Sequence, residues 1–211
     1  MHPLMTMLDA AATGSFPPVD GEVEVLDPGV DGHAAIVEFT GHSIVLGDVP
    51  LSELVAMGAD GFGGASSPEI KLRLAGPGGW VGCQDAVLVA SGREAAPGSG
   101  VLSVRTDLDD HPRVARSREH RDAVVVLGDE RGVVTFGNGL VGRRELSVEL
   151  FDAEPRSASA GRSLIEAALG HVPRAEFVWA QVSPGNAASL RAFLASGFVP
   201  IGAETLIVPS R

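Results

Sequence analysis

The sequence predicts an α/β protein with a mixed, mostly antiparallel β-sheet flanked by helices. Helix-type and strand-type segments alternate along the chain, and three successive strands in its second half are joined by turns too short for crossovers. The chain has 211 residues, of which 45% are hydrophobic and 20% charged. A chain of this length and composition buries a full core and folds as one or two globular domains.

Residues 1–100 precede the domain boundary that we expect. Residues 1–20 show no periodicity and are expected to form a poorly ordered lead-in. Residues 21–100 are expected to form a divergent α/β half that ends in a linker-like stretch at 91–100. The expected elements are a strand at 22–26, two strands within 34–46 that turn at Thr40-Gly41, helices at 52–57 and 69–74, and a strand within 80–90.

Residues 101–211 carry clearer signals and are expected to form a second domain. The short connections between the strands at 123–127, 133–136 and 145–151 predict an antiparallel meander. The other expected elements are a strand at 101–105, a basic helix at 112–122, a helix at 159–170, a strand at 176–182, a helix after Asn186 and a strand at 201–208.

Charge and composition exclude several classes of partner. The formal net charge is −11, which argues against binding to nucleic-acid phosphates. Residues 1–100 hold 13 of the 27 acidic but only 3 of the 16 basic side chains, so this half presents either a solvated acidic surface or a negative rim that attracts a cationic acceptor. The single cysteine and the scattered histidines predict no metal site. No apolar stretch is long enough to span a membrane, and a cytoplasmic location is expected.

The order of elements in residues 101–211 resembles that of the GNAT superfamily of N-acetyltransferases. The segment 156–161 (RSASAG) resembles the family's acetyl-CoA signature, [QR]-x-x-G-x-[GA], with Ser159 in place of the first glycine. Independently of the family, a run of very small residues at a helix start lets backbone N–H groups approach a pyrophosphate. The basic helix at 112–122 is interpreted as a solvated face, or as a contact for the 3'-phosphate of the cofactor or for an anionic acceptor.

A second block, residues 180–198 (AQVSPGNAASLRAFLASGF), resembles the family's strand, Asn and helix that end in Gly-Phe. In this family two successive parallel strands splay apart and hold the pantetheine arm of the cofactor. The resemblance implies that Asn186 bonds this arm, and Asn186 also fits a helix N-cap. The residues expected to bind the cofactor are Leu150, Phe151, Arg156, Ser157, Ala158, Ser159, Ala160, Gly161, Arg162, Asn186, Ser189 and Phe193.

Two carboxylates are candidates for the catalytic base. The strand at 145–150 places Glu145, Ser147 and Glu149 on one face, which we expect to line a wet groove unless both carboxylates are simply solvated. Glu149 is the first choice because it lies nearer the signature loop. The tyrosine that the family uses as an acid is replaced by Phe193, and the chain contains no tyrosine.

The sequence thus predicts an acetyltransferase that uses acetyl-CoA and an amine acceptor, either a small molecule or a peptide. The alternative is a GNAT-fold module that binds CoA or regulates without chemistry. No nucleic acid, membrane or metal is expected, and a homodimer stays open. Residues 21–100 are either a degenerate copy of the same half-fold or extra strands that shape the acceptor side.

Overall fold

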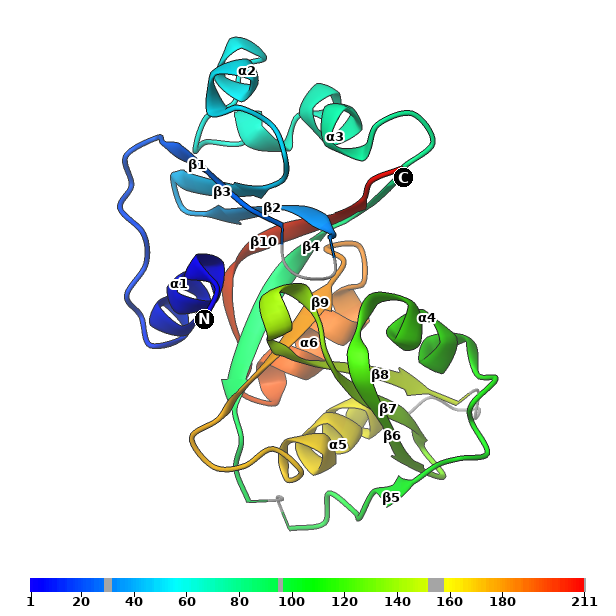
Figure 1. Cartoon of the computed structure of the whole chain (residues 1–211). Coiled ribbons are helices and arrows are strands. Elements are labelled where there is room, and N and C mark those ends of the chain that lie inside the picture. The colour runs from blue at the N-terminus through cyan, green and yellow to red at the C-terminus, as the bar shows by residue number, and fades with distance from the viewer. Residues whose placement is uncertain (29–31, 95–96, 152–157, 211) are drawn as a thin grey trace. The chain divides into compact units, whose positions relative to one another are not determined.

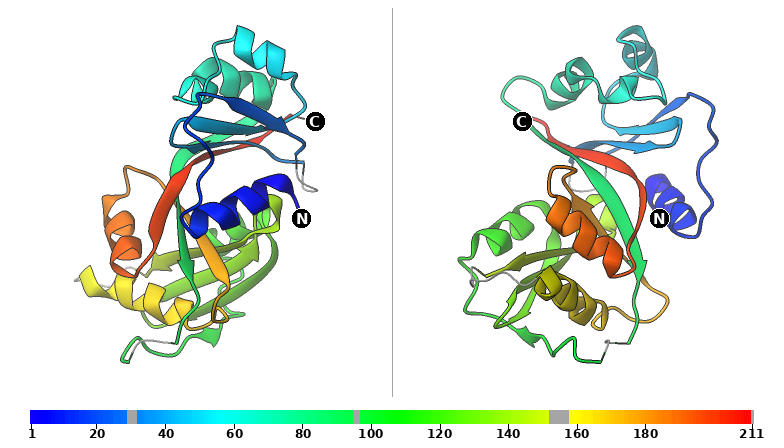
Figure 2. Two further views of the ribbon diagram at one scale, coloured as in Figure 1. Left: turned by 90° about the vertical axis from the view of Figure 1, so that its left-hand side faces the viewer. Right: turned by 180° about the vertical axis from the view of Figure 1, so that it is seen from behind.

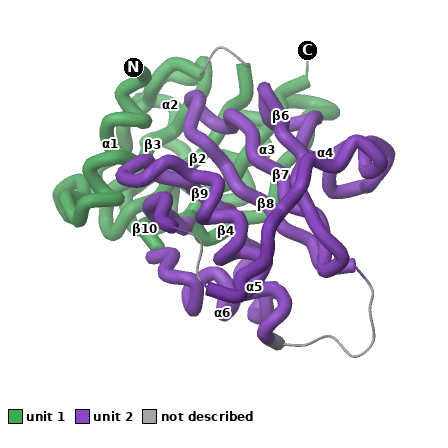
Figure 3. The backbone as a smooth tube through the Cα atoms, turned by 90° about the horizontal axis from the view of Figure 1, so that it is seen from below, with its two compact units in different colours: residues 1–87, 200–211 green, residues 88–199 purple. Residues whose placement is uncertain are grey.

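The computed structural model describes residues 1–28, 32–94, 97–151 and 158–210 (Figure 1). The chain divides into two compact units, residues 1–87 with 200–211 and residues 88–199 (Figure 3). The strand β4 (Trp80–Ser91) begins in the first unit and ends in the second. The division differs from the boundary expected at residue 100 in two ways. It falls within β4, and most of the last strand belongs to the first unit.

The first unit is a sheet covered by short helices. Its strands lie in the order β1-β3-β2-β10-β4, with β1 parallel to β3 and with β2 antiparallel to both β3 and β10. The β2–β3 hairpin turns at Thr40-Gly41, as predicted, and Gly41 supplies a positive φ of 68°. The elements are α1 (Pro3–Ala12), β1 (Val23–Leu26), β2 (Ala34–Phe39), β3 (His42–Leu46), α2 (Leu51–Ala56), the 3₁₀ helix η1 (Gly64–Ser66), α3 (Pro68–Ala75) and β10 (Val199–Val208).

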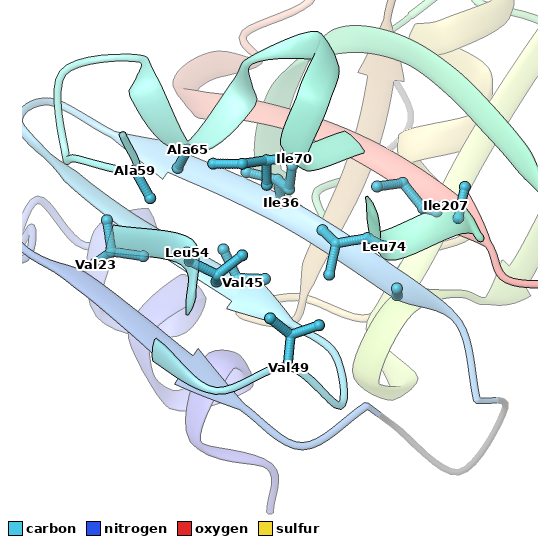
Figure 4. Packing of buried hydrophobic residues seen from close by; sticks show 12 residues of the cluster. Val23, Ile36, Val45, Val49, Leu54, Ala59, Ala65, Ile70, Leu74 and Ile207 are labelled. Carbon is cyan, nitrogen blue, oxygen red and sulfur yellow. The ribbon is translucent and has the colours of Figure 1, made fainter. Parts of the chain in front are cut away.

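The core of this unit lies between the sheet and the helices α2 and α3. Leu54 and Ile70 from the two helices are fully buried with Ile36 and Val45 of the sheet, and Ile207 of β10 joins the same cluster (Figure 4). Helix α3 begins with Pro68 in its first turn, after Ser67, whose side chain caps the helix.

The expectation of a poorly ordered lead-in is wrong for residues 3–12, which form α1. Leu4, Leu8 and Ala11 are buried, at a spacing that places them along one face of the helix. His2 caps the helix, because its side chain accepts a hydrogen bond from the backbone N–H of Leu4 at 3.2 Å. Residues 15–22 have no helix or strand.

The second unit contains the predicted meander. From the end of β4 its strands lie in the order β4-β9-β8-β7-β6-β5; the neighbours from β5 to β8 are antiparallel, and β9 is parallel to β8. The elements are β5 (Ser103–Val104), α4 (Pro112–His120), β6 (Asp122–Asp129), β7 (Gly132–Asn138), the 3₁₀ helix η2 (Leu140–Gly142), β8 (Arg144–Leu150), α5 (Ala158–Leu169), β9 (Phe177–Val182) and α6 (Ala187–Ala195).

Helices cover both faces of this sheet. Residues of odd number in β8 face α4, since Ser147 bonds to Ser117 of that helix. Leu150 has the opposite parity and lies against α5, which with α6 faces the viewer in the right-hand view of Figure 2. The predicted class, a mixed and mostly antiparallel sheet flanked by helices, is confirmed.

Within the described ranges, each helix is too short or too polar to cross a bilayer.

Candidate functional site

In the part of the chain that the structure describes, the parallel strands β8 and β9 share a single registered pair, Glu145 with Trp179. Both strands continue beyond this pair, β8 to Leu150 and β9 to Val182, without further pairing between them. We call the carboxyl-terminal parts beyond the pair, residues 146–150 and 180–182, the β8–β9 fork. In open α/β sheets, ligands bind beyond the carboxyl ends of strands where neighbouring strands part.

Two helices begin beyond the fork. Helix α5 follows β8 and begins at Ala158, and α6 follows β9 and begins at Ala187. The N–H groups of a first helical turn lack intrahelical partners and carry a partial positive charge, which suits an anionic ligand. The two helices pack closely here, because a Cβ added at Gly161 would lie 3.8 Å from the side chains of both Ala192 and Leu150.

The expected cofactor loop is only partly described. Arg156 and Ser157 lie outside the described residues, and Ala158 is described as the first residue of α5. Ser159 is exposed, and Ala160 and Gly161 are half-buried in the first turn. Arg162 pairs with Glu166 one turn later, at 2.7 Å between Nε and Oε1, and stays half-exposed.

Asn186 caps α6. Its side-chain oxygen accepts a hydrogen bond from the backbone N–H of the half-buried Ser189 at 3.1 Å, and its side chain is exposed. The N-cap interpretation is therefore confirmed, and the bond to a cofactor stays a prediction. Phe193, where the family has its tyrosine, is 3% exposed and packs edge-on against Phe198 with ring centroids 4.9 Å apart.

Phe151 lies on the α4 face of the sheet. Its ring is 6.0 Å from that of His111 and 5.9 Å from the guanidinium carbon of Arg105, centroid distances typical of edge and cation–π contacts. It also packs against the small cluster that contains Val114 and Val133. Its side chain is thus directed away from α5, and only its backbone lies next to the start of the cofactor loop.

Sequence reasoning missed Arg131, which reaches α5 from the β6–β7 turn. Its guanidinium donates to the hydroxyl of Ser163 in α5 and pairs with Asp129. Burial of Asp129 opposes its ionisation, but the hydrogen bonds from Arg131 outweigh this effect and lower the pKa of the Asp129 carboxyl. In the sequence, nothing at residues 129–132 signals contact with a helix 32 positions away.

The face of Glu145, Ser147 and Glu149 is not the wet groove that we expected, because α4 covers it. One side of α4, continued by Arg121 just after the helix, forms a polar ladder with β8 and β7, in which residues four apart in this segment meet residues two apart on the strand. The ladder consists of Arg113 bonded to Glu149 at 2.9 Å, Ser117 bonded to Thr135 at 2.7 Å, Thr135 bonded to Ser147 at 2.6 Å, and Arg121 bonded to Glu145 at 2.6 Å. Part of the basic helix therefore faces inward, and only its other side matches the expected solvated face.

Glu145 is a buried carboxylate held by two guanidinium groups. Arg143 donates to it at 2.8 Å and Arg121 at 2.6 Å. Burial alone would raise the pKa of Glu145, but the charges and hydrogen bonds of the two arginines hold it below its ordinary value. Gly139 is required beside it, because a Cβ there would lie 2.1 Å from the carboxyl carbon. A carboxylate so engaged is a poor proton acceptor.

Glu149 is the more available carboxylate. Its side chain is 41% exposed and pairs with that of Arg113, which is also half-buried. It lies near the carboxyl end of β8, closer to the start of α5 than Glu145 along the strand. The role of either residue in catalysis stays a prediction. In the described part of the chain, no three His, Cys, Asp or Glu side chains gather as a metal site requires.

Comparisons with known proteins complete these observations. No protein-family profile and no curated protein matches the chain. Among solved structures, it is similar to a GCN5-related N-acetyltransferase from Kribbella flavida, with 14% identity, a TM-score of 0.41, and coverage of 68% of this chain and 65% of that chain, just under two thirds. It is also similar to a protein described as an acetyltransferase of the GNAT family from Novosphingobium aromaticivorans, with 17% identity, a TM-score of 0.39, and coverage of 64% and 69%. Both likenesses are weak.

Proposed function

We propose that the protein transfers an acetyl group from acetyl-CoA to an amine. The observation that carries this proposal is the β8–β9 fork, in which two parallel strands pair at one point and each leads into a helix. Unpaired strand edges offer backbone donors and acceptors to an extended ligand that contains amides, and the pantetheine arm of CoA is such a ligand. The start of α5, with Ser159, Ala160 and Gly161, suits the pyrophosphate.

The chemistry requires one base and one acid. The amine nitrogen forms a bond to the thioester carbonyl carbon, the carbon–sulfur bond then breaks, and the ammonium proton leaves to a base while the thiolate gains a proton. Glu149 is the proposed base. It must exchange its bond to Arg113 for one to the amine or to a bridging water, and its partial exposure permits this exchange. Because the chain has no tyrosine, solvent is the proposed acid for the thiolate.

A second candidate is a module that binds CoA without transferring an acetyl group. The engagement of both candidate bases by arginines favours it, since neither carboxylate is free to accept a proton as the structure stands. The two candidates share the cofactor site and differ only in turnover.

The first experiment tests the cofactor site. Calorimetry with CoA should show that Ser159→Glu weakens binding at least about tenfold, because it places a carboxylate against the pyrophosphate. Ser52→Glu is the matched control, an exposed serine in the first turn of α2, and it should leave CoA affinity unchanged. Equal affinity of the two variants would remove the α5 start from the site.

The second experiment separates the two candidates. Glu149→Gln should lower kcat/KM with an amine acceptor by roughly 10²- to 10⁴-fold and leave CoA affinity unchanged. Tight CoA binding without transfer to any amine in a broad panel would instead support the binding module.

A further inference from the structure

Two hydrogen-bond donors on β9 are buried without an acceptor among the described residues. Trp179 is 3% exposed, and Gln181 lies two residues further on the same face of the strand. The indole Nε1 and the amide Nε2 are both shielded from solvent and have no hydrogen-bond partner among the residues that the structure describes. Buried donors in folded proteins are nearly always paired, so two in succession require an explanation.

The orientation of the Gln181 amide is set by its neighbour. Its Oε1 accepts a hydrogen bond from Nη2 of Arg121 at 3.3 Å. A guanidinium has donors only, so a flipped amide would place two donors against each other. The Nε2 group must therefore point away from Arg121 and needs an acceptor elsewhere.

The two donors flank the point at which the fork opens. Trp179 is the residue paired with Glu145, and Gln181 lies in the part of β9 that is no longer paired with β8. Glu145 is buried beside Trp179 and is held by Arg121 and Arg143, so the charged groups here already have partners. The indole and amide donors are uncharged and suit an uncharged acceptor, and a carbonyl oxygen has two lone pairs for two donors.

We propose that Nε1 of Trp179 and Nε2 of Gln181 bind a neutral carbonyl oxygen of a reactant at the opening of the β8–β9 fork. This inference deepens the proposed acetyl transfer and rests on it for the identity of the reactant. Two reactants offer this group, the thioester of acetyl-CoA and an amide carbonyl of a peptide-like acceptor. In either case the two side chains position the reacting molecule.

The direct test uses acetamide as the carbonyl probe and needs no CoA. In ¹⁵N-labelled protein that carries Trp80→Phe, the one remaining indole N–H signal belongs to Trp179. Acetamide should move this signal and the Gln181 side-chain amide signals, and ethylammonium should not. Gln181→Glu keeps the acceptor for Arg121 and removes the donor, so it should weaken the acetamide response about three- to tenfold. An unmoved Trp179 signal would overturn the inference, whatever CoA does.

Two arms then identify the source of the carbonyl. If the thioester is bound, acetyl-CoA should bind more tightly than CoA, and Trp179→Phe should reduce this difference about three- to tenfold while Trp80→Phe does not. If the acceptor is bound, L-alaninamide should be a better acceptor than isopropylamine, and Trp179→Phe should abolish the preference. An acetamide response without CoA binding would retain the carbonyl site and refute acetyl transfer. CoA binding without an effect of Trp179→Phe in either arm would refute the carbonyl site and leave the proposed acetyl transfer standing.

Discussion

Replacing Glu145 by glutamine should destabilise the protein more than the same change at Glu149 on the same strand, because Glu145 belongs to a buried ion pair and Glu149 to a partly exposed one. Glu145 has 7% of its side chain exposed and accepts from Arg121 and Arg143, the latter with a fully buried side chain. Removing one partner of a buried, hydrogen-bonded pair leaves the other charge uncompensated, which typically costs about 3–5 kcal/mol. We therefore expect Glu145→Gln to lower the free energy of unfolding by that amount.

The matched control is Glu149→Gln. Its carboxylate is 41% exposed and pairs with a half-buried Arg113, and exposed pairs contribute less than about 1 kcal/mol. Urea unfolding followed by far-UV circular dichroism near neutral pH measures both variants. A loss for Glu145→Gln within about 1 kcal/mol of the loss for Glu149→Gln would refute the assignment of a buried, tightly paired charge.

The pH dependence gives a second check on the same residue. The pKa of Glu145 is lowered in the folded protein from its ordinary value of 4.5, despite burial, because Arg143 and Arg121 stabilise the carboxylate. Its contribution to stability is then complete above pH 4.5 and is lost as the pH falls toward the folded pKa. The difference in the free energy of unfolding between wild type and Glu145→Gln should therefore become smaller below that pH. A constant difference would contradict the ionised state.

Three further predictions concern single elements. Gly139→Ala should destabilise the second unit strongly, because its Cβ would meet the Glu145 carboxyl group at 2.1 Å. The Cβ of Gly142→Ala would meet nothing within 4 Å, so this change should cost only about 1–2 kcal/mol for its positive φ. Midpoints of urea unfolding compare the two variants. Asn186→Ala should cost about 1 kcal/mol by removing the α6 cap, and Asn186→Asp should keep the cap but weaken CoA binding about tenfold in calorimetry; unchanged affinity would limit Asn186 to capping. Leu8→Ala should cost about 2–5 kcal/mol in thermal or urea unfolding, and wild-type stability would show that α1 contributes little.

The sequence alone predicted the order and type of most elements, because the signals involved are local. Alternating apolar residues and a tight turn at Thr40-Gly41 act within a few positions of the chain. Helix α1 was missed although Leu4, Leu8 and Ala11 have helical spacing, because methionine, proline and small residues around them obscured the pattern. The small residues at 158–161 and the cap at Asn186 were also local, and both lie at helix starts as predicted.

Only the tertiary structure decided what lies against each face and edge. The period of two in β8 showed that Glu145 and Glu149 share a face, but a period cannot tell whether water or a helix covers that face. Their partners Arg121 and Arg113 are 24 and 36 positions away, and such pairings depend on how the strands and α4 pack. The buried donors of Trp179 and Gln181 are likewise visible only once their neighbours are in place. Strand β10 pairs with β2, which lies near the other end of the chain. This pairing could not be predicted, because hydrogen bonding between strands depends on spatial proximity and leaves no local pattern in the sequence.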